Sequence, residues 1–424
     1  MRVPSFLCLA LLVGTTASGG LPSARGQAVR SQPVLEKIVL VSRHGVRSPT
    51  QPVERLKEAT GRDWPAWPVP PGQLTDHGRM DLALMGDFLG RHYRAAGLLP
   101  AAGCPRQADV VIWADAADDR TRQSGEIMAR TVAGGCPVTS GSLPAGRHDP
   151  MFNALAGGAA ILNRAETMRA LSAVLRRDPR GPAAVRRALS TMQDVIAPGG
   201  CGSAAGPCLA TAFAVDWGHG GPHLSAGPAL AATSAENLLL EYLQDMPEDA
   251  IAWGRRDVPA LLDDIMPAHA YASGLLRRLP AIAYPRGRVL ASAILDLLDG
   301  KPVTLPDGTV IGGDARLVMF AGHDTTLDML ATIFGLDWQF ADQPDRTAPD
   351  TTLGLELWRR PDGAPIVRAV IFHQGLAELR HALPLENTDR AMALRIAACP
   401  QGQDCPLPVV EKGIRAAIAT HAPG

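Results

Sequence analysis

The chain has 424 residues, of which 46% are hydrophobic and 20% are charged, and its formal net charge is −1. This composition is that of a globular protein with a large core and two domains. The nearly balanced charge argues against a nucleic-acid-binding protein, because such proteins carry a basic excess or a basic face. An anionic ligand must therefore be recognised by a local group of cations.

The N-terminus has the pattern of a secretory signal peptide, which we assign to residues 1–28. Arg2 supplies a basic start, an apolar run covers residues 6–13, and small residues follow. Cleavage near Ala17 and cleavage as late as Ala28 both fit this pattern. The apolar run is too short to span a bilayer, and no other stretch is long enough. We expect a mature protein that is periplasmic or secreted and has no membrane partner.

Seven cysteines are present, and six remain when Cys8 leaves with the signal peptide. An even number in an exported chain favours disulfide bonds. A zinc site is the alternative, but no C-x-x-C pair or Cys/His cluster supports it. Proximity along the chain suggests one of the fifteen possible connectivities, namely Cys201 with Cys208, Cys399 with Cys405 and, by elimination, Cys104 with Cys136.

Three short runs of β-branched and aromatic residues, 37–42, 109–114 and 316–321, predict strands that are buried on both faces. Between the first two, Thr75 is a suitable N-cap for a helix over residues 76–96. Strands that alternate with helices indicate an α/β layer, and ligands of such layers bind beyond the carboxyl ends of the strands.

The middle of the chain, residues 140–284, is rich in Ala and Leu and has few strand signals. We interpret it as a mainly helical cap domain, interrupted by the Gly- and Pro-rich stretch 198–207. The α/β catalytic domain would then consist of residues 34–139 and 285–424.

Polar residues follow each of the three predicted strands: "RHGVRSPT", "DAADDRTR" and "GHDTT". Phosphoryl transfer without a metal needs fixed positive charge around the phosphate, an unprotonated nucleophile and a proton donor for the leaving oxygen. Arginines supply the charge, and His44 can attack as a neutral imidazole, because adjacent guanidiniums oppose its protonation. Asp324 can supply the proton, although capping of the helix that follows is an alternative role for it.

"RHGVRSPT" together with "FAGHDTT" resembles the signature pair of the histidine acid phosphatases, the exported branch of the histidine phosphatase superfamily. The likeness is to bacterial periplasmic phytases and glucose-1-phosphatases. It extends through residues 64–106, through "DRTRQSGE" at 119–126 and from Phe320 to Cys405. It covers nearly all of the mature chain and is weakest in the helical middle.

The resemblance implies a phosphoglycerate-mutase-like α/β domain with a mixed central sheet and a mainly helical inserted domain. It implies no metal and no organic cofactor. His44 would be the nucleophile that becomes phosphohistidine, and Asp324 would protonate the leaving group. The phosphate would be held by four side chains: Arg43, Arg47, Arg120 and His323. The acidic residues between the second strand and Arg120 are expected to form a solvated loop: Asp115, Asp118 and Asp119.

Substrate contacts are expected from Thr50, at the end of the first motif, and from Glu236 and His269 in the helical region. Gln51 is a departure, because some phytate-cleaving relatives have a lysine there. We favour phytate (myo-inositol hexakisphosphate) as the substrate, with glucose 1-phosphate or other sugar phosphates as the alternative. A non-catalytic phosphate binder is a third possibility, and a monomer is expected.

Overall fold

The computed structural model describes residues 32–202, 206–218, 220–254, 257–386 and 390–421. The predicted signal peptide, residues 1–28, lies outside these residues. None of the helices that the structure describes is both long and apolar enough to cross a membrane.

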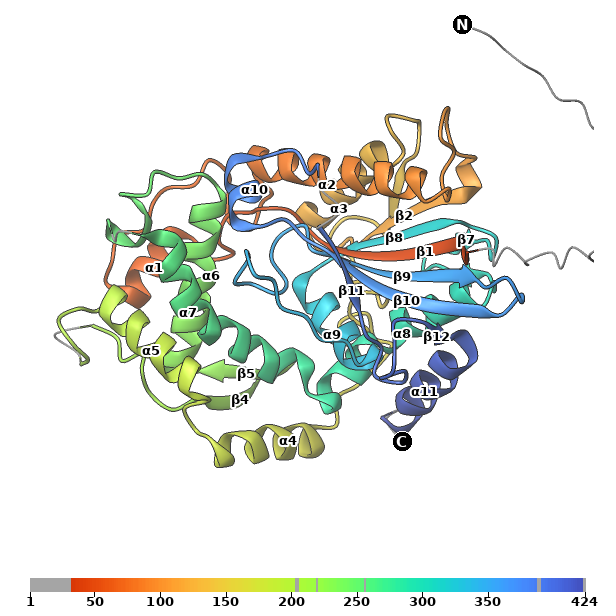
Figure 1. Cartoon of the computed structure of the whole chain (residues 1–424). Coiled ribbons are helices and arrows are strands. Elements are labelled where there is room, and N and C mark those ends of the chain that lie inside the picture. The colour runs from red at the N-terminus through yellow and green to blue at the C-terminus, as the bar shows by residue number, and fades with distance from the viewer. Residues whose placement is uncertain (1–31, 203–205, 219, 255–256, 387–389, 422–424) are drawn as a thin grey trace, which may run out of the picture. The chain divides into compact units, whose positions relative to one another are not determined.

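A mixed sheet forms the centre of the α/β part, and within the described residues it has eight strands. Seven follow the order β11-β10-β9-β1-β8-β2-β3, and β12 pairs with β10 (Figure 1). Pairing is parallel from β1 through β8 and β2 to β3, and antiparallel from β1 through β9 and β10 to β11. The strands are β1 (Val34–Arg43), β2 (Val110–Ala114), β3 (Ser140–Ser142), β8 (Leu317–Gly322), β9 (Thr352–Arg359), β10 (Pro365–Phe372), β11 (Ala391–Leu394) and β12 (Cys405–Pro406).

Helices cover both faces of this sheet, which explains why β1 is buried along nearly its whole length and has an apolar run in its middle. Ile38 and Leu40 pack in one buried cluster with side chains of α2 (Asp76–Ala95) and α3 (Asp119–Val132). Val39 and Val41 point the other way and pack with the C-terminal helices α8 (Pro280–Leu298), α9 (Asp324–Phe334) and α11 (Leu407–Thr420) (Figure 1). Successive side chains of β1 therefore contribute to the buried clusters on the two faces of the sheet in turn.

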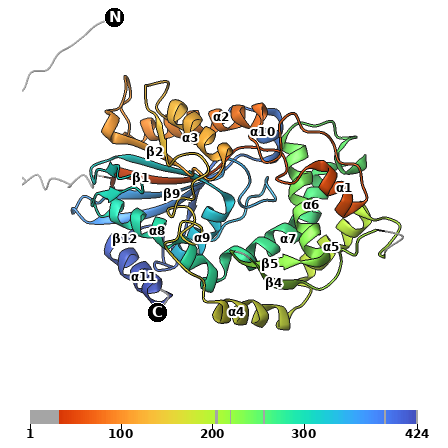
Figure 2. The same ribbon diagram turned by 180° about the vertical axis from the view of Figure 1, so that it is seen from behind.

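A third buried cluster belongs mainly to the helices beside the sheet, and Figures 1 and 2 show these helices from opposite sides. They are α1 (Val53–Thr60), α4 (Arg164–Arg177), α5 (Ala183–Ile196), α6 (Ala226–Leu243) and α7 (Val258–Ser273). A π-helical turn, η3 (Gly274–Arg278), continues α7, and α10 (Leu376–His381) packs near α6.

The predicted strands and the first long helix are present. Each strand occurs within two residues or so of its expected bounds, apart from an earlier start of β1, and Thr75 caps α2 by accepting a hydrogen bond from Gly78 N. The helical middle differs from its sequence pattern, because it contains a hairpin of β4 (Ala214–Gly218) and β5 (Gly221–Ser225). A smaller hairpin joins β6 (Val303–Thr304) to β7 (Val310–Ile311).

Three disulfide bonds join the six cysteines of the described chain, and the pairs are those that proximity along the chain suggests. The bonds are Cys104–Cys136, Cys201–Cys208 and Cys399–Cys405.

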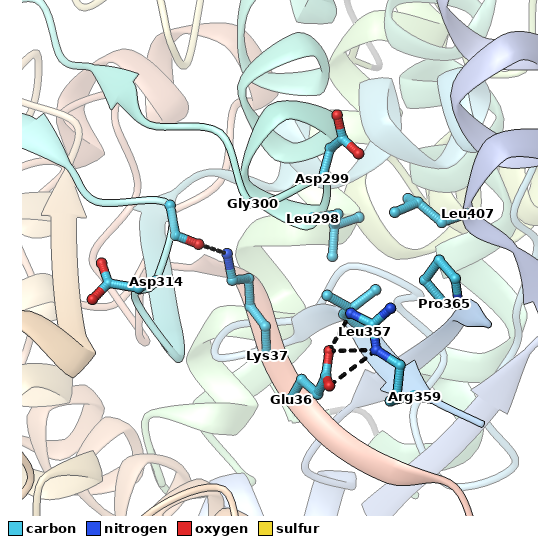
Figure 3. A pocket seen from close by; sticks show the side chains of 11 residues that line it. Glu36, Lys37, Leu298, Asp299, Gly300, Asp314, Leu357, Arg359, Pro365 and Leu407 are labelled. Atoms are coloured by element: carbon cyan, nitrogen blue, oxygen red, sulfur yellow. Dashed lines mark hydrogen bonds and ion pairs between the residues drawn. The ribbon is translucent and has the colours of Figure 1, made fainter. Parts of the chain in front are cut away.

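A cavity of about 440 Å³ lies at the start of β1, at the opposite end of that strand from His44 (Figure 3). Lys37 in its wall is buried and donates hydrogen bonds to the carbonyl oxygens of Leu297 and Gly313. Arg359 forms an ion pair with Glu36 at 2.8 Å. Lys37 therefore ties the last turn of α8 to the sheet, because a buried ammonium needs acceptors.

Candidate active site

The three strand ends that carry the polar motifs lie side by side, because β1, β8 and β2 are parallel neighbours. The backbone pairing continues one residue beyond the strands. His44 N donates to Gly322 O at 3.0 Å, and Asp115 N donates to Ala321 O at 2.9 Å. The residues that follow all three strands thus meet at one edge of the sheet.

His44 is buried at this edge, and its ring orientation is fixed by its own loop. Its Nδ1 lies 2.9 Å from Gly45 O. A carbonyl can only accept, so Nδ1 carries the proton and Nε2 keeps its lone pair in the neutral ring. Burial, together with the nearby charges of Arg120, Arg43, His323 and Arg47, holds the pKa of His44 well below its usual value. Nε2 is therefore available as a nucleophile in acid.

Arg43 and Arg47 converge on one carboxylate oxygen of Glu236, which comes from α6. Oε1 of Glu236 lies 2.7 Å from Arg43 Nη2 and 3.2 Å from Arg47 Nη2. Burial would raise the pKa of Glu236, but Arg47, His269 and Arg43 outweigh it and lower the pKa to about 2. An ionised oxygen therefore bridges the two guanidiniums that the sequence predicts to hold phosphate.

Asp345 fixes Arg43 from behind, and sequence reasoning missed it. Its Oδ2 lies 3.0 Å from Arg43 Nη1, and the same Nη1 donates to Thr347 O. Its other oxygen accepts from Thr347 N at 2.9 Å. Arg43 is 1% exposed, so its charge is held by these groups and by Glu236. No signal near Asp345 marks it, because the partner lies about 300 residues away in sequence.

Arg120 enters from the first turn of α3, close to the first motif. Its guanidinium donates to Gly72 O at 3.2 Å and pairs with Asp118 at 2.8 Å. A side chain at Gly72 would place its Cβ 3.5 Å from Arg120 Nη1 and 3.8 Å from Thr50 Cγ2, so Thr50 and the Arg120 guanidinium both lie next to Gly72. Arg122, the second arginine of the "DAADDRTR" motif, instead pairs with Asp119.

His323 is oriented by Asp115, which corrects the expectation of a solvated loop at that residue. Asp115 is 4% exposed, and its Oδ2 lies 2.9 Å from His323 Nε2. The sheet explains the burial, since Asp115 continues the pairing of β2 with β8. The rings of His323 and His44 lie edge to face with centroids 5.6 Å apart. A carboxylate therefore holds the second histidine against the first.

Asp324 is the first residue of α9, and His323 occupies the N-cap position. Its Oδ2 lies 2.8 Å from Arg277 Nη1 and 3.9 Å from Arg43 Nη2. Burial alone would raise the pKa of Asp324, but Arg277, Arg43 and His44 outweigh it and hold the pKa well below its usual value. In the ligand-free site Asp324 is ionised. Arg277 is the second residue that sequence reasoning missed.

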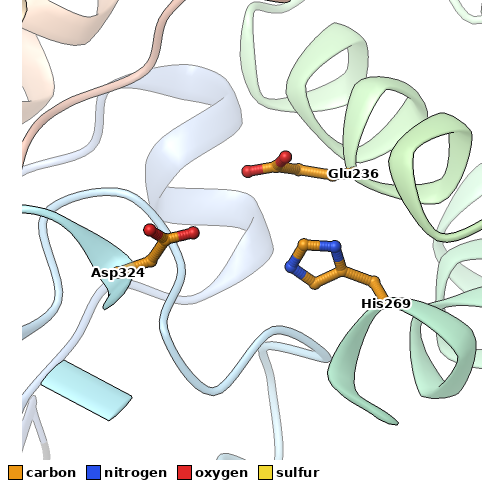
Figure 4. A group of neighbouring side chains, drawn as sticks. All are labelled: Glu236, His269 and Asp324. Atoms are coloured by element: carbon orange, nitrogen blue, oxygen red, sulfur yellow. The ribbon is translucent and has the colours of Figure 1, made fainter. Parts of the chain in front are cut away.

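Glu236, His269 and Asp324 face one another across the site (Figure 4), and one donor atom of each lies within 4.8 Å of the others. Such a group could hold a metal ion. Here Glu236 is paired with Arg43 and Arg47, and Asp324 with Arg277. Because three guanidiniums already balance the two carboxylates, we interpret the group as the acidic part of an arginine-rich anion site.

The structure thus brings His44, Asp324 and the four predicted phosphate-holding side chains to one edge of the sheet. Glu236 and His269 face them from α6 and α7, which form the opposite wall. The arrangement offers a nucleophilic nitrogen, a carboxyl group and a cationic pocket.

The chain is similar to known proteins in sequence and in fold. The family model of the histidine phosphatase superfamily (branch 2) matches residues 34–178. Phytase AppA of Escherichia coli is 31% identical over 391 residues, which cover 87% of each chain. The glucose-1-phosphatase of Salmonella typhimurium is 23% identical over 391 residues, 88% of this chain and 90% of that one.

A solved structure of Hafnia alvei phytase in complex with myo-inositol hexakis sulphate superposes with a TM-score of 0.83 at 28% identity. The match covers 92% of this chain and 99% of the Hafnia chain. Sequence and fold therefore place the chain in the histidine phosphatase superfamily (branch 2), and it is a histidine acid phosphatase, a hydrolase of phosphomonoesters.

Proposed function

We propose that the enzyme transfers the phosphoryl group to His44 and that phytate is its preferred substrate. The observation that carries the proposal is the placement of a neutral, buried imidazole among guanidiniums, with Asp324 on the same edge of the sheet. The arginines neutralise the phosphate oxygens, which is the main requirement of phosphoryl transfer.

In the first step, Nε2 of His44 attacks phosphorus while the bond between phosphorus and the leaving oxygen breaks. The leaving oxygen takes a proton from Asp324, so an alcohol departs and Asp324 is left as a carboxylate. Arg43, Arg47 and Arg120 bind the transferred phosphoryl group, and His323, oriented by Asp115, donates a further hydrogen bond.

In the second step, water attacks the phosphohistidine and its proton passes to the carboxylate of Asp324. Phosphate leaves, His44 returns to the neutral state, and Asp324 is again protonated for the next substrate. Before either step, the substrate phosphate has to displace Glu236 Oε1 from its position between Arg43 and Arg47.

Phytate is favoured because the site has more groups that can bind phosphate oxygens than one phosphate requires. Arg277 adds a guanidinium beside Asp324, and His269 has a buried Nε2 without a hydrogen-bond partner among the described residues. These groups can replace the lysine that is missing at Gln51. The similarity to phytase AppA and to the Hafnia phytase supports the same choice.

A glucose-1-phosphatase is the second candidate, because relatives of that name match over nearly the full chain. Steady-state kcat/KM for phytate, glucose 1-phosphate and p-nitrophenyl phosphate would decide between the two. We expect the highest value for phytate, and negligible turnover of phytate would remove it as the substrate. A non-catalytic phosphate binder, the third possibility, predicts no turnover of all three.

We further propose that the protein acts as a monomer in the periplasm or outside the cell. The three disulfide bonds support an oxidising compartment. The expected division into an α/β domain of residues 34–139 and 285–424 and a helical cap of residues 140–284 needs one correction, because Ser140–Ser142 form β3 of the central sheet. Beyond that strand we retain it, since the helical cluster is largely separate from the two clusters on the sheet.

A further inference from the structure

Arg277 occupies an unusual backbone segment next to the proposed acid. It lies in η3, a π-helical turn of residues Gly274–Arg278 between α7 and α8. Turns of this kind are rare and occur often at functional sites. The turn places Arg277 Nη1 2.8 Å from Asp324 Oδ2 and 3.5 Å from Asp328 Oδ2, both of which belong to α9.

Arg277 also lines a pocket of about 250 Å³ that adjoins the phosphate site. The pocket is continuous with the site because Glu236, which bridges Arg43 and Arg47, lies in its wall. Since one water molecule has a share of about 30 Å³ in the liquid, the pocket has room for a phosphate group. Its other polar walls are His223, Thr233, His269 and Ser273.

Arg277 has more than one carboxylate partner: burial would lower its pKa, but Asp324, Asp328 and Glu236 outweigh burial and raise it. Asp328 is 2% exposed and burial raises its pKa, with Arg277 and Arg278 opposing that rise. Arg277 also faces Arg286, whose pKa is lowered by burial and then by Arg277. A second phosphate in the pocket would therefore compete with Asp324 and Asp328 for this guanidinium.

Building on the proposed function, we propose that Arg277 determines specificity by binding a second phosphate of a polyphosphorylated substrate, and that it leaves its ion pair with Asp324 to do so. A substrate with one phosphate cannot recruit Arg277 in this way. Binding of a polyanion by Arg277 would thus change the charge around Asp324, the acid that protonates the leaving group.

The sign of the effect on the acid follows from the charges. Burial would raise the pKa of Asp324, and among the groups that lower it Arg277 has the largest effect. When Arg277 turns to a phosphate, Asp324 loses a cation and gains an anionic neighbour, so its pKa rises. The other groups that face Asp324 are the same with either kind of substrate: Arg43 at the end of β1, His44 just after it, Arg120 from α3, Glu236 from α6, His269 from α7 and Asp328 from α9.

When Arg277 leaves Asp324, the carboxyl group can hold the proton that phosphorylation of His44 requires. Protonated Asp324 gives its proton to the leaving oxygen as the bond from phosphorus to that oxygen breaks and the bond to His44 Nε2 forms. At a pH where the ligand-free enzyme has an ionised Asp324, a polyphosphate substrate therefore supports faster phosphorylation of His44 than a monophosphate with the same kind of alcohol.

The first test uses the wild-type enzyme and two substrates that release similar alcohols, myo-inositol 1-phosphate and phytate. Rapid quenching in alkaline denaturant measures the single-turnover rate of phosphohistidine formation at saturating substrate. We expect the rate to decline at a pH about one unit higher with phytate, since one charge within a few ångströms shifts a carboxyl pKa by about 1–3 units. If the rate declined at the same pH with both substrates, the proposal that Arg277 leaves Asp324 would be overturned.

The second test compares Arg277→Gln and Arg277→Lys with Arg278→Gln as the matched control. Arg278 belongs to the same turn and lies 3.7 Å from Asp328 Oδ1, but its ion pairs among the described residues do not include Asp324, and it contacts Leu336 O and the ring of Trp338. We expect Arg277→Gln to lower the ratio of kcat/KM for phytate to that for the monophosphate by about tenfold or more. It should also move the monophosphate decline to higher pH. The control should change neither quantity, and Arg277→Lys should lie between.

An unchanged ratio and an unchanged pH profile in a folded Arg277→Gln enzyme would overturn the assignment. If that variant does not fold, the wild-type comparison and Arg277→Lys still decide. Failure of the proposed function looks different, because wild type would then form no phosphohistidine or would not turn over phytate at all.

Discussion

Arg43 and Asp345 form a buried ion pair, with Nη1 and Oδ2 3.0 Å apart and both side chains almost without solvent exposure. Asp345 is itself fixed by Thr347, which donates to its other oxygen. The direction of the Arg43 guanidinium is therefore set from the side away from the substrate.

Replacing Asp345 with Asn should loosen Arg43 and weaken binding of phosphate. We expect the KM for a phosphomonoester to rise about tenfold and the free energy of unfolding to fall by roughly 1–3 kcal/mol, the usual cost of a poorly paired buried group. Asp342→Asn is the control, because Asp342 belongs to the same loop but pairs with Arg390. Denaturant unfolding and steady-state kinetics measure both. An unchanged KM in Asp345→Asn would contradict the positioning role.

Glu236 occupies the position that a phosphate oxygen needs, so Glu236→Gln should strengthen inhibition by inorganic phosphate. The amide has no charge to compete with the anion, and we expect Ki to fall about three- to tenfold, which corresponds to about 1 kcal/mol. Glu241→Gln is a control on the same helix, where a buried carboxyl has its pKa raised to about 8 by burial. A higher Ki in Glu236→Gln would mean that Glu236 supports phosphate binding rather than opposing it.

Asp324→Asn removes the proposed proton donor, and its effect should depend on the leaving group. Alkyl phosphates need a proton on the departing oxygen, whereas p-nitrophenol leaves as an anion. We expect kcat/KM to fall by about 10²–10⁴ for glucose 1-phosphate, the usual contribution of acid catalysis, and by much less for p-nitrophenyl phosphate. Equal losses on both substrates would rule out the proton-donor role.

The pH dependence of the wild-type enzyme should follow from the protonation states of Asp324 and His44. Asp324 acts as an acid only when protonated, so kcat/KM for alkyl phosphates should decline as pH rises through its pKa. His44 must be neutral, and its lowered pKa keeps it neutral well below the usual histidine value. The optimum should therefore be acidic, and a profile that rises from pH 5 to pH 8 would contradict the assignment.

Asp81 provides a test of stability away from the chemistry. It is wholly buried on α2 without a hydrogen-bond partner among the described residues. Burial and nearby Asp350 raise its pKa to about 10. Its folded-state pKa lies above the unfolded value, so its contribution to stability is largest at low pH and declines as pH rises from about 4 towards 10.

Asp81→Asn should therefore raise Tm at pH 7 by about 2 °C or more and raise it less at pH 4. Asp87→Asn is the control on the same helix, where the carboxylate is exposed and pairs with Arg91. Calorimetry at the two pH values measures the difference. A fall in Tm at pH 7 would mean that an ionised Asp81 stabilises the fold.

Local sequence was sufficient for the parts of the site that follow a strand. The strands before His44 and Asp324 each contain a continuous apolar run, and the polar motifs begin just after those runs stop. The helix at Thr75 was predictable because its cap and its apolar spacing are both local. These features depend on neighbours within a few residues.

The rest of the site depends on which distant segments pack together. Asp345 lies in the segment before β9, and the pairing of β9 with β1 brings that segment to Arg43. Arg277 is brought to Asp324 by a π-helical turn, which the spacing of apolar residues does not indicate. Asp115 looked like one of several loop carboxylates, and only the continued pairing of β2 with β8 buries it. The β4–β5 hairpin was missed because its sequence is rich in Gly and Pro and lacks strand-forming runs.

The most direct test of the account is to trap the covalent intermediate. Wild type and His44→Ala would be mixed with phosphate-labelled substrate and quenched in alkaline denaturant, which preserves phosphohistidine. We predict label on the wild-type protein that is stable to alkali, labile to acid and located on the peptide that contains His44, and none on His44→Ala. Normal turnover by His44→Ala, or label on another residue, would contradict the mechanism.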